Sequence, residues 1–157
     1  MSFESVINRF GALVRSLSSS SSLEGPEIPF PFQLESFAPQ IEHHLAPLIL
    51  VARADHELLR AERDVIVDHC RAVLRRRDKL LSESEITALE DFADHFSPNA
   101  SQLDAALRKF EGEGKDEFTS LLAAADRVIL ADDVVREEER TALAEIKKLF
   151  DQLHAKS

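Results

Sequence analysis

The chain carries the stretch ADHELLRAER at residues 54–63, and the same pattern returns as ADDVVREEER at residues 131–140. Both copies consist of Ala-Asp, six further residues and Glu-Arg. Each copy follows an apolar segment and precedes an amphipathic one, so the match includes the context as well as the letters. We therefore expect a helix-turn-helix unit that occurs twice in the chain.

The segments around both copies place apolar residues at the three- and four-residue steps of a helix. Ser82 and Glu85 match the capping-box pattern, and Ser97-Pro98 predicts the start of a later helix, which Gly112 and Gly114 end. No segment alternates apolar and polar residues, so we expect an all-α fold. The predicted helices cover about residues 37–46 and 47–54, divided at Pro47, and then 60–77, 82–96, 98–110, 115–130 and 136–154.

A separate amphipathic segment opens the sequence, and its apolar residues also follow helical spacing. They are Phe3, Val6, Ile7, Phe10, Leu13, Val14 and Leu17. The serine run and the prolines that follow disfavour helix and predict a long linker. We therefore expect residues 1–35 to form a helical arm with its linker, and residues 36–157 to form the domain. The apolar stripe requires a cover, which the domain itself, a protein partner or second copy, or a membrane surface could provide.

The composition limits the classes of partner and the compartment. The net charge of -10 disfavours binding to the phosphate backbone of nucleic acids, and the one basic run, Arg71 to Lys79, is predicted to be a solvated helix end. The single Cys70 has no partner for an internal disulfide, and the N-terminal segment lacks the features of a secretory signal, so we expect a cytoplasmic protein. No run approaches the roughly 20 apolar residues of a membrane span. The polar side of the arm has few basic residues, which makes contact with a membrane surface the weakest of the three covers.

Catalytic motifs are missing from the sequence, so we expect a binding protein and not an enzyme. The stretch from His56 to Arg60 ends in Arg where a zinc-protease motif requires a second His. The sequence has no nucleophile elbow and no phosphate-binding Gly-rich loop. Cys70 falls on the apolar face of a predicted helix, where a thiol is inert and has a raised pKa. His43, His44 and His69 are interpreted as surface or core residues, because adjacent side chains on a helix point about 100° apart.

The two Ala-Asp turns resemble those of the tellurite-resistance TerB family, in which each half carries a helix-ending Ala-Asp-Gly turn followed by an acidic residue that opens the next helix. The similarity covers roughly residues 37–153. It implies a helical bundle of about seven or eight helices with an approximate internal two-fold repeat, in addition to the N-terminal arm. It also implies a protein that acts by binding, as a protein-interaction adaptor in bacterial stress resistance, with a protein partner or a second copy. The family's glycine is replaced by His56 and Asp133, and its next aspartate by Leu59 and Arg136.

The resemblance also suggests a divalent metal ion at the acidic turns, held by Asp55, Glu62, Asp132 and Glu139. Carboxylate oxygens are the ligands that hard cations such as Ca²⁺ and Mg²⁺ prefer. The alternative is that each Asp caps the backbone of its own turn, while each Glu lies favourably in the first turn of the following helix. The second interpretation is favoured, because the replacements at Leu59 and Arg136 remove one carboxylate from each turn.

Overall fold

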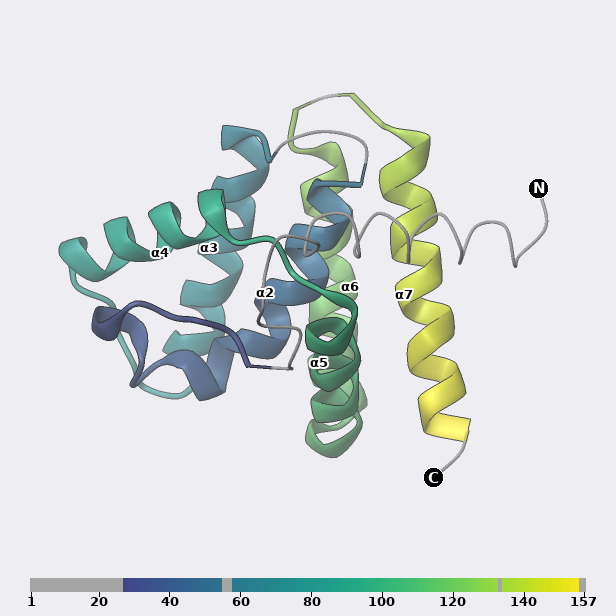
Figure 1. Cartoon of the computed structure of the whole chain (residues 1–157), viewed down its shortest axis with the longest axis horizontal. Helices are drawn as coiled ribbons and strands as arrows, with labels where there is room; N and C mark the ends of the chain where they lie inside the picture. The colour runs from purple at the N-terminus through teal and green to yellow at the C-terminus, as the bar shows by residue number, and fades with distance from the viewer. Residues whose placement is uncertain (1–26, 55–57, 133, 156–157) are drawn as a thin grey trace.

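The computed structural model describes residues 27–54, 58–132 and 134–155, and this part of the chain folds into α-helices without a strand (Figure 1). The all-α prediction is therefore confirmed. The elements are the 3-10 helix η1 (Phe32–Leu34) and the six α-helices α2 (Ala38–Ala52), α3 (Arg60–Arg75), α4 (Glu83–His95), α5 (Ala100–Glu113), α6 (Lys115–Leu130) and α7 (Glu137–Ala155). The helix predicted over residues 3–17 lies outside the described residues.

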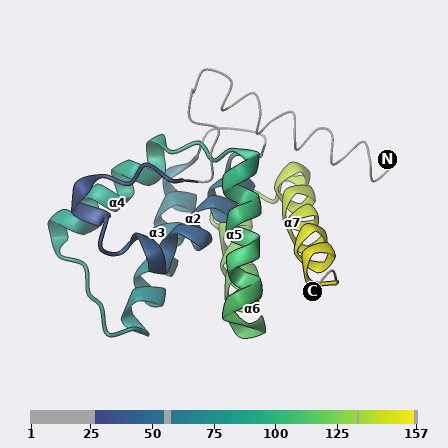
Figure 2. The same cartoon turned by 60° about the horizontal axis from the view of Figure 1, so that its bottom comes forward.

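Helix α2 is the centre of the bundle. It contacts α3, α5, α6 and α7, and every residue from His43 to Ala52 is buried. A helix that is apolar on all sides can be buried only when neighbours surround it, and this explains its central position. Figures 1 and 2 show α3 and α4 on one side of the α5–α6 pair and α7 on the other.

The prediction of two short helices divided at Pro47 is wrong, because α2 runs through Pro47 without a break. Proline lacks the N–H that would bond the carbonyl of His43, and a proline inside a helix costs about 3 kcal/mol. The surrounding residues more than offset this loss. Leu45, Leu48 and Ile49 are fully buried, and each buried side chain of this size contributes about 1.5–3 kcal/mol.

The helix ends agree with the sequence at α4 and differ at α5. Ser82 and Glu85 form the predicted capping box, with the Glu85 N–H donating to Ser82 Oγ at 3.2 Å and the Ser82 N–H donating to Glu85 Oε1 at 2.8 Å. Helix α5 was predicted to start at Ser97-Pro98, but Asn99 caps it. Asn99 Oδ1 accepts from the Gln102 N–H, and Gln102 Oε1 accepts from the Asn99 N–H, both at 2.8 Å. Asn is among the strongest N-caps, and Gln at the third helical position completes the box.

Residues 27–34, which the sequence assigned to the linker, pack on the domain. Leu34 is fully buried, and the Phe30 ring stacks on Phe92 of α4 with the ring centroids 4.7 Å apart. The Gln102 side-chain amide donates to the Glu27 carbonyl at 2.7 Å. The chain therefore joins the bundle at α4 and α5 before α2 begins.

Candidate functional site

Glu62 and Asp132 accept backbone N–H groups of their own turns in the part of the chain that the structure describes. Glu62 is fully buried at the third position of α3, and its Oε1 accepts from the Leu59 N–H at 3.0 Å. Glu139 is also fully buried, at the third position of α7. Asp132 Oδ1 accepts from the Val134 N–H at 3.2 Å. These contacts favour the structural interpretation of the turns.

In the second turn, the residue that differs from the TerB pattern makes a contact within the turn. Arg136, which stands where an aspartate was expected, donates through a guanidinium N–H to Asp132 Oδ2 at 3.1 Å. Asp55 lies outside the described residues. Within those residues, no three His, Cys, Asp or Glu side chains form a group suited to a metal ion. The proposal that Asp55, Glu62, Asp132 and Glu139 bind a metal stays a prediction.

Three buried histidines form a cluster that was not predicted from the sequence. His43 and His44 of α2 and His69 of α3 are 3% exposed or less. His69 Nε2 lies 2.8 Å from His44 Nδ1, so one ring donates a hydrogen bond to the other. The rings of His43 and His44 pack against the buried ring of Phe110, with centroids 4.7 and 4.8 Å away.

The cluster continues to the corner where α5 ends and α6 begins. His43 Nε2 lies 2.8 Å from Glu113 Oε2, and Arg77 lies 3.6 Å from the same oxygen. Arg77 belongs to the basic run that was predicted to be only solvated, so the prediction misses its role as an ion-pair partner.

A second carboxylate of the corner makes a parallel set of contacts. His44 Nε2 lies 3.3 Å from Glu117 Oε2, and Arg76 lies 3.7 Å from Glu117 Oε1. The histidine, glutamate and arginine side chains thus connect α2 and the end of α3 to the α5–α6 corner. A signal for this cluster was present in the sequence. Polar residues inside an all-round apolar helix must be buried, and buried polar groups need partners.

Burial keeps the histidine rings neutral. Desolvation, together with repulsion from the neighbouring rings of His43 and His69, lowers the pKa of His44 to about 2. Desolvation lowers the pKa of His69 to about 4, with additional repulsion from Arg127. The pKa of His43 is also lowered by burial, although Glu113 partly opposes this. At neutral pH the cluster therefore consists of neutral rings beside two ion pairs.

Cys70 behaves as the sequence indicated. Its side chain is fully buried, and desolvation raises the pKa of the thiol to about 12. A thiol in this state is a packing group and not a nucleophile.

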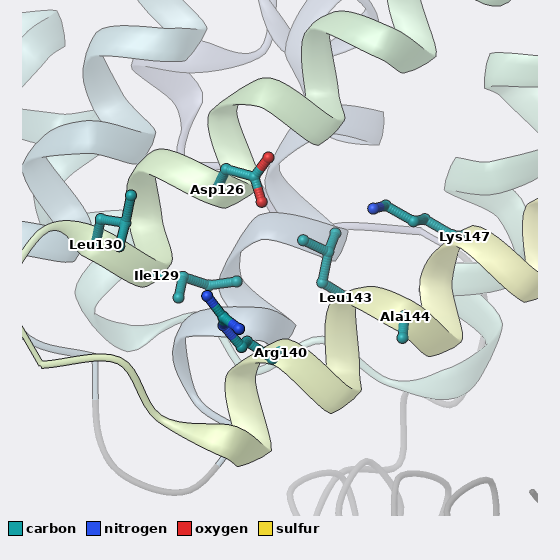
Figure 3. Close-up of a pocket in the computed structure, with 7 residues that line it drawn as sticks. All are labelled: Asp126, Ile129, Leu130, Arg140, Leu143, Ala144 and Lys147. Carbon is teal, nitrogen blue, oxygen red and sulfur yellow. The ribbon is translucent and has the colours of Figure 1, made fainter.

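A hollow of about 440 Å³ lies on the surface between α6 and α7 (Figure 3). Ile129 and Leu143 provide its buried apolar floor, and Ala144 of α7 is exposed beside them. The remaining lining residues are Asp126, Leu130, Arg140 and Lys147. Figure 3 shows the Asp126 carboxylate and the Lys147 ammonium pointing toward each other across the hollow.

Exposed apolar side chains gather beside this hollow. Among the described residues, five large apolar side chains are strongly exposed, and three of them are Leu130, Val134 and Val135 at the α6–α7 connection. Leu130 is 56% exposed and also lines the hollow. This part of the surface has the apolar centre and charged rim that are typical of protein-binding sites.

Comparison of the chain with protein-family models, with curated proteins and with solved structures found no match. None of the helices in the described residues is long and apolar enough to cross a membrane. The predicted partner-binding residues of the arm, from Phe3 to Leu17, lie outside the described residues.

Proposed function

We propose that this chain is a TerB-like helical binding module, a protein-interaction adaptor in bacterial stress resistance of the tellurite type. The surface between α6 and α7 is the place where it binds a protein partner. The observation that carries this proposal is the hollow beside Leu130, Val134 and Val135, where apolar side chains lie exposed to solvent.

The repeated turns support the TerB-like part of the proposal. Glu62 and Glu139 occupy the third position of α3 and of α7, the helices that follow the two turns, and both side chains are fully buried. Carboxylates are rarely fully buried unless they are paired, so a buried glutamate at the same helix position after both turns is an unusual match. An equal placement of both glutamates is what a duplicated helix-turn-helix unit would produce.

The chemistry of the hollow indicates the kind of partner. Its floor of Ile129 and Leu143 suits an apolar side chain, and burying one such side chain contributes about 1.5–3 kcal/mol. Arg140 and Lys147 lie seven residues apart on α7, which is about 10 Å along a helix axis. They suit a segment that carries carboxylates on either side of its apolar anchor, while Asp126 opposes a more acidic partner at one edge.

A pair of matched variants tests the proposal. Ala144→Arg places a long charged side chain in the hollow, and Ala123→Arg makes the same change at an exposed position of α6 that does not line it. Both variants should keep the melting temperature of the wild type within about 2 °C, because exposed helix positions change stability by roughly 0.5 kcal/mol or less.

Affinity capture from the native cell then compares the three proteins. We expect a partner, or a second copy of the chain, to be retained by the wild type and by Ala123→Arg and to be lost with Ala144→Arg. Equal retention by both variants, or no specific retention by the wild type, would show that the α6–α7 surface is not a binding site.

A further inference from the structure

The α5–α6 corner meets the bundle through charged and titratable side chains as well as through the buried rings of Phe110 and Phe118. Glu113 is the last residue of α5 and Glu117 lies in the first turn of α6, and both meet the histidine cluster. Only Gly114 separates the two helices, and its φ of 103° is a left-handed conformation that few other residues adopt without strain. The corner therefore combines a flexible backbone position with polar contacts to α2 and to the end of α3.

The hydrogen bond between the two imidazoles cannot survive full protonation. His69 Nε2 and His44 Nδ1 are 2.8 Å apart, and one of the two nitrogens must carry no hydrogen. A neutral His44 with its proton on Nε2 accepts from His69 and points its N–H toward Glu117. A proton added at His44 Nδ1 removes this acceptor and leaves two N–H groups facing each other.

The surrounding cations oppose protonation of His44 and His69, whereas Glu113 and Glu117 favour a charge on His43. Glu113 and Glu117 are already paired with Arg77 and Arg76. Lys109 of α5 repels a charge on His43, and Arg127 of α6 repels one on His69. An imidazolium in this cluster therefore meets four cationic side chains and two carboxylates. They are Arg76, Arg77, Lys109, Arg127, Glu113 and Glu117.

We propose that His43, His44 and His69 form an acid-sensitive latch, which holds the α5–α6 corner against α2 and α3 and releases it before the rest of the bundle opens. Release separates the corner carboxylates from the imidazoles and uncovers Phe110, which packs on both His43 and His44. Glu117 lies in the first turn of α6, whereas Asp126, Ile129 and Leu130 of the hollow lie in its second half, and no histidine of the latch lines the hollow.

Hydrogen exchange of the full-length chain, read by mass spectrometry at about pH 7.5 and about pH 5 and corrected for the intrinsic exchange rates, tests this latch. We expect protection of residues 109–119 to fall at least about tenfold more than protection of residues 142–150 in α7. An equal loss of protection throughout the bundle would overturn the proposal, because it would indicate ordinary global destabilisation.

Histidine variants separate the latch from a general acid effect. In His44→Gln and His69→Gln, the loss of protection at residues 109–119 should exceed the loss at residues 142–150 by only about threefold or less. Each variant removes one site of proton uptake. His95→Gln is the matched control, because His95 is exposed on α4. In this variant the α5–α6 corner should lose protection to the same extent as in the wild type. An unchanged corner response in both cluster variants would overturn the proposal. If these variants do not fold, the wild-type comparison of the corner with α7 still decides.

Discussion

Replacing Glu62 with alanine tests whether this buried carboxylate stabilises the start of α3. Glu62 Oε1 accepts the Leu59 N–H at 3.0 Å, and Leu59 itself provides no side-chain cap for α3. A hydrogen bond to a charged group contributes about 1.5–3 kcal/mol, and its loss leaves the N–H at the helix start without this acceptor. Truncation also removes buried methylene groups, whereas it relieves the desolvation of the carboxylate. We expect Glu62→Ala to lower the free energy of unfolding by about 2–3 kcal/mol.

The matched substitutions make this prediction specific. Glu62→Gln keeps the accepting oxygen and the length of the side chain, so its loss should be about 1 kcal/mol. If the chain contains a duplicated unit, Glu139→Ala and Glu139→Gln should follow the same order with similar sizes. For a chain of this size, 2–3 kcal/mol corresponds to a melting temperature lowered by roughly 5–10 °C.

Circular dichroism during urea and thermal unfolding measures all four variants under one set of conditions. A loss below about 0.5 kcal/mol in Glu62→Ala would contradict the capping role of Glu62, because that size is ordinary for a surface substitution. A large loss at Glu62 with none at Glu139 would contradict the equivalence of the two turns, and the resemblance to the TerB family would lose its main support.

Three further outcomes follow from the same contacts and from the sequence. Asp132→Asn should lower stability only slightly, and Asp132→Ala should cost about 1 kcal/mol more, because Asn caps nearly as well as Asp. Unfolding measured with and without millimolar Ca²⁺, Mg²⁺ or Mn²⁺ checks this. If Asp132→Asn is as destabilising as Asp132→Ala, but only in the presence of metal, the result would favour a metal site. Deleting residues 1–23 should lower the melting temperature measured by calorimetry, because the apolar stripe of the arm requires a cover and the domain itself could provide it. An unchanged melting temperature, together with loss of a partner or of dimerisation, would identify the arm as an interaction segment. Acid should destabilise the fold, because the pKa values of His44 and His69 are lowered to about 2 and about 4, so the unfolded chain takes up protons first. The stability that these two neutral rings contribute should be complete above about pH 6.5 and fall below it, down to about pH 4 for His69 and about pH 2 for His44. About 4 kcal/mol should be lost from the two rings by about pH 5, as urea unfolding at several pH values would reveal.

The helices of the described residues were predictable because their signals are local. The capping box of Ser82 and Glu85 and the positive-φ Gly114 depend on residues a few positions apart, and the structure places α4 and α6 as the sequence indicated. Pro47 was misjudged for a physical reason. Local propensity favours a break at proline, while burial of α2 on all sides stabilises a continuous helix.

The candidate sites depend on contacts between distant segments, and this limited their prediction. His44 and His69 are separated by 25 positions in sequence, and their bond exists only because α2 and α3 pack together. The hollow likewise needs α6 and α7 side by side. The positions of Glu62 and Glu139 in the first turn of α3 and α7 were predicted, since a carboxylate in the first turn of a helix is a local pattern.

Photo-crosslinking in the native cell tests most directly whether this chain binds a protein through the α6–α7 surface. A photoreactive amino acid replaces Ala144 in the hollow or, as the control, the exposed Ala123 of α6. We predict a discrete crosslinked product from position 144 that is absent from position 123. No product from position 144, or the same product from both positions, would contradict the proposed binding site.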